Sequence, residues 1–193
     1  MDYTTVARVK LALGASEETD DSLLGSIVVS VSRAMDRMLS GRADCSNYLQ
    51  SESKTETLRG RVDKDGRILC HPLKPRISSV ASFAYRATPL DGWQSVDVNR
   101  LSISGYAVTA FTSLTGRDPQ FVQITYTGGL AAAVADLPAD ILDAADILAV
   151  RFYREIKSGL GDAIGLAETG EMIYTKAWPV RVLEMLAPYK RKI

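Results

Sequence analysis

Hydrophobic residues near the N-terminus recur at three- and four-residue steps, which is the spacing of an amphipathic helix. A short stretch with Val6, Val9 and Leu13 ends at Gly14 and predicts a first helix. A longer apolar stripe predicts a second helix that ends at Gly41, and its members are Leu24, Ile27, Val28, Val31, Met35, Met38 and Leu39. The N-terminal part is therefore expected to be a pair of helices.

The middle of the chain changes to short alternating runs separated by turn residues, a pattern typical of strands. Asp63-Lys64-Asp65-Gly66 predicts a hairpin turn, and Asp91-Gly92 predicts a second turn. Strands are expected over 55–58, 67–70, 77–86, 93–98, 101–104, 107–111 and 121–127. Six or seven strands in roughly seventy residues indicate a small antiparallel sheet, sandwich or barrel-like module.

The C-terminal part returns to helical spacing. Pro138 suits the first turn of a helix that ends at Gly159, with acidic residues early and basic residues late along it. Its broad apolar face is formed by Ile141, Leu142, Ala145, Leu148, Ala149, Phe152, Tyr153 and Ile156. The stretch 159–175 has little periodicity and is expected to be a loop. Trp178-Pro179 then leads into a short terminal helix that stops at Pro188.

These patterns predict an α+β fold in which N- and C-terminal helices pack as a small bundle and a β-rich module lies in the middle. Residues 1–53 are expected to form a helix pair and a loop, and residues 54–129 an antiparallel β module. Residues 130–193 are expected to form the C-terminal helices and a tail, and to pack with 1–53 as one helical core.

Composition narrows the possible functions. The chain has 23 Lys and Arg against 23 Asp and Glu, whereas a general nucleic-acid binder usually carries a basic excess. No apolar run approaches the roughly 20 residues that span a bilayer. The N-terminus lacks the basic and apolar regions of a secretory signal, so we expect the protein to work where it is made.

The residues that usually carry chemistry form no recognisable constellation. Cys45, Cys70 and His71 are too few for a four-ligand zinc site, and free thiols are expected. The glycines of 159–165 imitate a dinucleotide fingerprint, but they follow a helix where that fingerprint follows a strand. The sequence therefore predicts no metal, no cofactor and no enzymatic activity.

The acidic residues and the first basic cluster are expected to be solvated surface, whereas the basic cluster at the C-terminus could also dock on an acidic partner or face a phosphate backbone. Asp136, Asp140, Asp143 and Asp146 lack the ligand spacing of a calcium loop, and solvent-exposed acids at a helix start explain them. Arg59, Arg61, Lys64 and Arg67 surround the first hairpin, and a second basic cluster covers 190–192. Neither cluster has the interleaved aromatic residues of a surface that binds single-stranded nucleic acid.

Three stretches, taken in order, resemble the head–tail connector (adaptor, or head-completion) proteins of long-tailed bacteriophages. The first is the opening helix pair at 3–14 and 21–42. The second is the strand-to-helix junction, VQITYTGG at 122–129 followed by LPADI at 137–141. The third is the closing helix at 182–190. The chain departs from a minimal connector in its large, β-rich middle.

The resemblance implies a structural virion protein that forms a ring, commonly dodecameric, beneath the portal. Such a ring extends the DNA channel and offers a platform to the next neck protein or the tail. The partners implied are other copies of the chain, the portal protein, a downstream neck or tail-completion protein, and double-stranded DNA that passes without sequence readout. The place implied is the virion neck, after assembly in the host cytoplasm.

The C-terminal tail is the expected portal-docking segment, because aromatic anchors dominate interfaces and a basic end suits an acidic partner. Its residues are Trp178, Leu186, Tyr189, Lys190, Arg191, Lys192 and Ile193. Two alternatives remain open. One is a tail-completion or tail-terminator virion protein. The other is a small enzyme or ligand-binding domain with 159–175 as a lid over a pocket of convergent polar groups.

Overall fold

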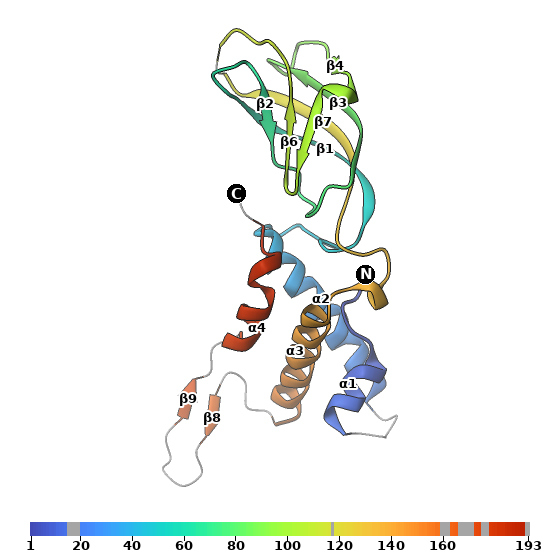
Figure 1. Ribbon diagram of the computed structural model, residues 1–193. Helices are drawn as coiled ribbons and strands as arrows, with labels where there is room; N and C mark the ends of the chain where they lie inside the picture. Colours follow the sequence, from blue (N-terminus) through green and yellow to red (C-terminus); the bar gives the residue numbers. More distant parts are fainter. Residues whose placement is uncertain (15–19, 117, 159–162, 166–171, 175–177, 192–193) are drawn as a thin grey trace. The chain divides into compact units, whose positions relative to one another are not determined.

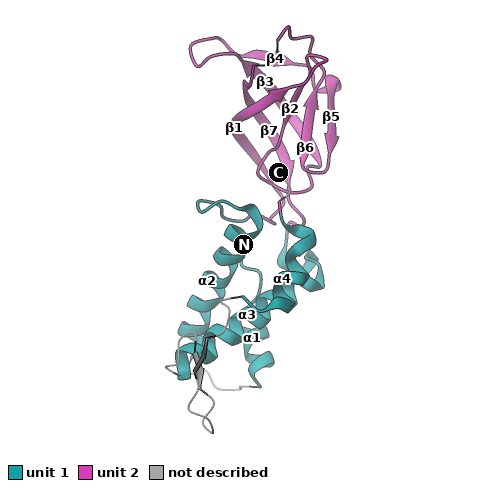
Figure 2. Cartoon of the chain, turned by 90° about the vertical axis from the view of Figure 1, so that its left-hand side faces the viewer, with its two compact units in different colours: residues 1–47, 133–190 teal, residues 48–132, 191–193 magenta. Residues whose placement is uncertain are grey.

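A computed structural model describes residues 1–14, 20–116, 118–158, 163–165, 172–174 and 178–191. The chain divides into two compact units, coloured separately in Figure 2. The helical unit comprises residues 1–47 and 133–190, and the β unit comprises residues 48–132 and 191–193.

Four α-helices form the helical unit: α1 (Val6–Leu13), α2 (Asp21–Ser40), α3 (Ala139–Ser158) and α4 (Val180–Leu186). The hydroxyl of Thr5 accepts a hydrogen bond from the N–H of Arg8 and caps α1, and Gly14 ends this helix in the left-handed conformation. Helix α3 packs against the other three helices (Figure 1). It is therefore the central element of the unit.

A buried carboxylate fixes the chain's first residues to α2. Asp36 is 2% exposed and accepts hydrogen bonds from the hydroxyl of Tyr3 and, at 2.7 Å, from the backbone N–H of Asn47. The backbone N–H of Tyr3 donates to the hydroxyl of Ser32 at 2.9 Å. A buried carboxylate is tolerated when its oxygens are hydrogen-bonded, so this network anchors both flanks of the helix pair.

The β unit is one seven-stranded antiparallel sheet, curled around its core, with strand order β4-β3-β7-β1-β2-β6-β5. Its strands are β1 (Glu52–Val62), β2 (Ile68–Cys70), β3 (Ser79–Arg86), β4 (Gln94–Val96), β5 (Leu101–Ser104), β6 (Ala107–Ala110) and β7 (Gln120–Gly128). Alternate residues of each strand point inward, and Phe83, Val122, Ile124 and Tyr126 are among those that fill the core.

The first hairpin forms at the predicted turn, where the carboxylate of Asp63 accepts from the backbone N–H groups of Asp65 and Arg67 at 2.8 and 2.9 Å. Only the end of β1 pairs with β2, through Arg61 and Val62. The rest of β1 pairs with β7, its neighbour at the centre of the sheet. The long strand β1 thus belongs to two pairings, which the local turn pattern alone does not indicate.

The predicted fold class, α+β with a β-rich module between terminal helices, is confirmed. The interpretation of 159–175 as a loop is wrong in part, because β8 (Ala163–Gly165) pairs with β9 (Met172–Tyr174). The remaining residues of that stretch, 159–162, 166–171 and 175, lie outside the described residues.

Candidate interaction face

The residues predicted to dock a partner lie in different environments. Leu186 is fully buried in the helical unit, so its side chain offers no surface to a partner. Trp178 and Tyr189 are half-buried, and Lys190 is exposed. Trp178, Tyr189 and Lys190 therefore keep accessible surface, whereas Leu186 packs in the core.

The end of the tail belongs to the β unit. The guanidinium of Arg191 donates from Nη2 to the backbone carbonyl of His71 at 2.8 Å. This hydrogen bond occupies part of a side chain that the sequence assigned to docking. Lys192 and Ile193 lie outside the described residues.

Helix α4 carries apolar residues on two faces. Val182 and Leu186 are fully buried against the unit, whereas Val180 and Leu183 are 56% and 40% exposed. The exposed pair lies three residues apart and so shares one side of the helix. Five of the seven residues at 180–186 are apolar, more than one buried face requires, and this was the sequence signal for a second face that the docking prediction did not include.

Four side chains form an alternating row across the β unit, which we name the arginine–aromatic row: Arg59, Phe121, Arg86 and Trp93. Register places Phe121 opposite Arg59 on one neighbouring strand and opposite Arg86 on the other. The guanidinium carbon of Arg59 lies 4.5 Å from the centre of the Phe121 ring, and that of Arg86 lies 4.3 Å from Trp93 and 6.0 Å from Phe121. These distances are those of cation–π contacts.

The row ends a larger surface, the outer sheet face, formed by the outward positions of β1, β3 and β7. Its other members are Ser53, Thr55, Thr57, Arg61, Ser82, Ala84, Gln123, Thr125 and Thr127. The hydroxyls of Thr55 and Thr125 lie 2.9 Å apart across β1 and β7. No carboxylate lies at these described positions, so the face is polar and positively charged.

This geometry corrects the expectation that the basic cluster lacks interleaved aromatic residues. Phe121 lies beside Arg59, and Phe111 lies 5.2 Å from the guanidinium of Arg67. The rings come from distant parts of the chain, and only strand pairing brings them between the arginines. A guanidinium group presents planar N–H donors that suit carboxylate or phosphate oxygens, although that of Arg67 already lies 3.6 Å from a carboxylate oxygen of Asp65.

The acids of α3 also differ from the expectation of solvated charge. Asp146 is 15% exposed and accepts from Nε and Nη2 of Arg8 on α1, at 3.0 and 2.6 Å. Asp143 lies 3.6 Å from the same guanidinium. The ion pair raises the pKa of Arg8 through its hydrogen bond with Asp146, so these two acids join α1 to α3. Asp136 and Asp140 are exposed, as expected.

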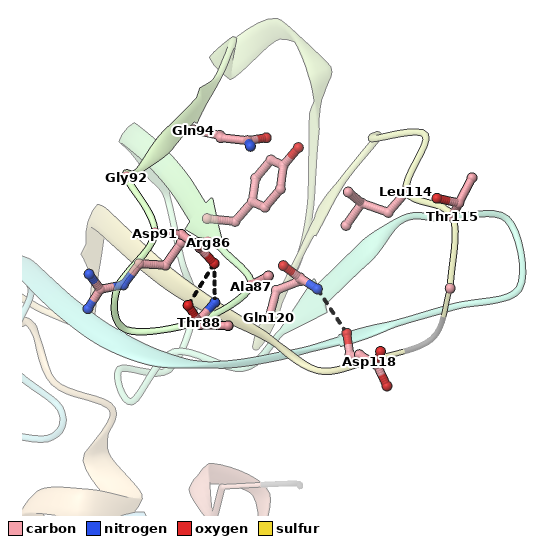
Figure 3. Close-up of a pocket in the computed structure, with 12 residues that line it drawn as sticks. Arg86, Ala87, Thr88, Asp91, Gly92, Gln94, Leu114, Thr115, Asp118 and Gln120 are labelled. Carbon is pink, nitrogen blue, oxygen red and sulfur yellow. Dashed lines mark hydrogen bonds between the residues drawn. The ribbon is translucent and has the colours of Figure 1, made fainter.

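A pocket of about 600 Å³ lies at one end of the β sheet, between the β3–β4 turn and the segment before β7 (Figure 3). Asp91 accepts from the N–H and hydroxyl of Thr88 at 2.7 and 2.8 Å, and these bonds lower the pKa of its carboxyl group. The side-chain amide of Gln120 donates to the backbone carbonyl of Asp118 at 3.1 Å. Asp91 and Gln120 thus each have a hydrogen-bond partner within the lining of the pocket.

Within the described part of the chain, no group of three or more His, Cys, Asp or Glu side chains is arranged to hold a metal ion. Cys45 and Cys70 are both buried, and among the described residues neither forms a disulfide. Burial raises the pKa of the Cys70 thiol to about 12, which keeps it protonated at neutral pH. Among the described helices, none is both long and apolar enough to cross a bilayer.

Sequence comparisons give no relative: no protein family matches the chain, and no curated protein matches it. Solved structures do match. A chain in the virion of a native gene transfer agent particle shares 18% identity and a TM-score of 0.59, over 97% of this chain and 89% of that one. A chain in the neck of an empty gene transfer agent particle, computed with C6 symmetry, shares 16% identity and a TM-score of 0.57 over the same fractions. The chain therefore has the fold of proteins found in the neck and virion of a phage-like particle.

Proposed function

We propose that this chain is a structural protein of a virion neck, the adaptor subunit of a ring that sits beneath the portal. The observation that carries the proposal is the shared fold, which spans 97% of the chain in both particle structures. A likeness over both units, rather than over one helix bundle or one sheet, favours a common architecture. The order of elements that resembled connector proteins in the sequence supports the same assignment.

A ring is the assembly that this role requires. The neck structure with a similar chain was computed with C6 symmetry, which describes repeated copies around an axis. A closed ring uses a heterologous contact, in which two different patches of one subunit meet on neighbouring copies. The ring would extend the DNA channel and present a platform to the next neck or tail protein. In this role the chain contributes shape and contacts and carries out no catalysis.

The tail and the outward face of α4 form the portal-docking surface in this proposal. Val180 and Leu183 supply exposed apolar area on α4, and Lys190 supplies positive charge in the tail. Trp178 and Tyr189 keep accessible surface, and large aromatic residues are common anchors of interfaces. Leu186 supports the helix from within and is not part of this surface.

A complementation experiment tests the assignment. The gene is deleted from the system that encodes it, and particles are purified after complementation with the wild-type chain or with the double variant Val180→Ser and Leu183→Ser. We expect unjoined heads and tails without the protein, wild-type chain at the neck by electron microscopy, and loss of neck occupancy by the variant. The exposed substitution Leu11→Ser on α1 is the matched control. Normal particles without the protein would contradict the proposed function.

A further inference from the structure

The net charge of zero conceals a separation of charge between the two units. The helical unit contains 16 Asp and Glu against 11 Lys and Arg, a formal charge of −5. The β unit contains 7 Asp and Glu against 12 Lys and Arg, a formal charge of +5. Every copy of the chain therefore carries one negatively charged unit and one positively charged unit, which can attract the opposite units of other copies.

The positive charge of the β unit includes cations that no local carboxylate neutralises. Arg59 and Arg61 project from the outer sheet face and form no ion pair among the described residues. Arg86 donates from Nη1 to the carbonyl of Pro89 at 2.8 Å and stacks on Trp93, and it lies close enough to Asp91 to help lower the pKa of that carboxyl group, so its charge is partly balanced. Stacking orders the guanidinium groups of Arg59 and Arg86 before a partner arrives, which reduces the entropy lost when they bind.

The helical unit supplies exposed carboxylates of the opposite sign. Asp136 and Asp140 are exposed, and neither forms an ion pair within the described residues. This contrasts with Asp143 and Asp146, which hold Arg8. The unit's excess of five negative charges therefore includes groups that remain available to a guanidinium.

We infer that the outer sheet face docks on the helical unit of a second copy of this chain, with Arg59, Arg61 and Arg86 opposite its exposed carboxylates. The inference rests on the ring proposed above and names the two surfaces that meet. It fits a heterologous contact, because one patch is positive, the other is negative, and every copy carries both. The hydroxyl groups of the outer sheet face, among them those of Thr55 and Thr125, add uncharged donors and acceptors to the contact.

A nucleic-acid phosphate backbone is the rival partner for an arginine-bearing face. Two observations favour the second copy. The rings of the row are stacked by guanidinium groups, so they are not open platforms for bases. The compensating charge of −5 also lies in the same chain, where it would repel a polyanion.

Charge reversal in the purified full-length chain tests the inference, with mass measured by analytical ultracentrifugation at low and high salt. Variant A carries Arg59→Glu and Arg61→Glu, and variant B carries Asp136→Lys and Asp140→Lys. We expect the wild type to associate at low salt and to dissociate as salt screens the contact. We expect each variant to weaken association at least about tenfold, since like charges then face each other. Variant AB, with all four changes, should regain most of the lost association.

The controls are Lys64→Glu at the hairpin tip and Glu184→Lys on α4, which change charge elsewhere in the same units; both should associate as the wild type does. Circular dichroism and thermal melting check that each variant is folded. A wild-type chain that stays monomeric at low salt overturns the inference, as does failure of AB to recover. A gel-shift experiment with a random-sequence DNA duplex tests the rival partner. If variant A associates as the wild type does but no longer retards the duplex that the wild type retards, the outer sheet face binds phosphate and the inference is overturned. These outcomes concern the subunit contact, whereas absence from particles concerns the neck assignment.

Discussion

At the scale of single residues, one charged cluster joins the start of α2 to the end of α3. Nζ of Lys157 lies 2.8 Å from a carboxylate oxygen of Asp20, and the hydroxyl of Tyr153 donates to the other oxygen. These two donors lower the pKa of Asp20, and the carboxylate in turn raises the pKa of Lys157. The contact links elements more than a hundred positions apart in the sequence.

The sign of the pH dependence follows from the lowered pKa of Asp20. A group whose pKa is depressed in the folded state adds stability above its unfolded value, near 4, and that stability is lost as pH falls through the folded value. We expect Asp20→Asn to reduce the free energy of unfolding at pH 7, and the difference from wild type to shrink towards pH 3. Urea unfolding at both values measures it.

The matched control for that experiment is Asp118→Asn. Asp118 is exposed, and its side chain forms no ion pair among the described residues. We expect the same loss of charge at Asp118 to leave the free energy of unfolding nearly unchanged at both pH values. An Asp20 effect that is equally large at pH 3 would contradict the electrostatic account.

Residue contacts across the fold were the part that the sequence did not reveal. Arg8 and Asp146 are each ordinary surface residues by local pattern, and only the packing of α1 on α3 brings them together. The arginine–aromatic row likewise depends on which strands are neighbours. By contrast, the exposure of Asp136 and Asp140 followed from their position at the start of a helix.

At the scale of elements, a glycine in β1 permits close packing with the neighbouring strands. A Cβ atom at Gly60 would lie 2.5 Å from a methyl group of Ile68 and 2.8 Å from one of Val122, inside the core. Gly25, in α2, has no atom within 4 Å of such a Cβ. The two glycines therefore differ in the space around them, although neither requires a left-handed backbone.

The two glycines give opposite predictions for the same substitution. We expect Gly60→Ala to lower the free energy of unfolding by about 1–3 kcal/mol, because overpacking displaces core side chains. We expect Gly25→Ala to raise it by about 0.4–1 kcal/mol, because alanine restricts the unfolded chain and favours helix. Thermal and urea unfolding of both variants measure the difference, and two changes of the same sign would contradict it.

Elements were the scale at which sequence reasoning worked best. Periodicity located α2 and α3, and alternation with turn residues located β3, β5, β6 and β7, because one buried face imposes the spacing along each element. The sequence did not predict which strands are neighbours, because β1 pairs with β7 across more than fifty intervening residues. The β8–β9 pair was missed because three-residue strands carry too little alternation to detect.

At the scale of the whole molecule, the main segment of the β unit, residues 48–132, begins and ends at one place. The N–H of Ser51 donates to the carbonyl of Ala131 at 2.8 Å, and the N–H of Leu130 donates to the carbonyl of Leu49 at the same distance. The segments on either side of the sheet thus run side by side where the unit begins and ends. Such a geometry is that of an inserted unit, because its removal leaves two chain ends close together.

Excision of the β unit tests this arrangement. A chain in which a short Gly-Ser linker joins Asn47 to Ala133 should remain helical by circular dichroism and unfold cooperatively, since the core of α1 to α4 lies within the helical unit. The matched control has the same linker inserted between Asn47 and Tyr48 of the intact chain. Loss of helical structure after excision, with the control folded, would show that the helices depend on the sheet.

The paired crossing at Leu49–Ser51 and Leu130–Ala131 has a consequence for how such a protein changes over time. Because residues 48–132 begin and end at adjacent segments, this part of the chain can be lengthened, shortened or exchanged without changing the sequence of the helices. Selection acting on the sheet and selection acting on the helices are then largely uncoupled. The same paired segments are the place at which a foreign module could be grafted onto this chain.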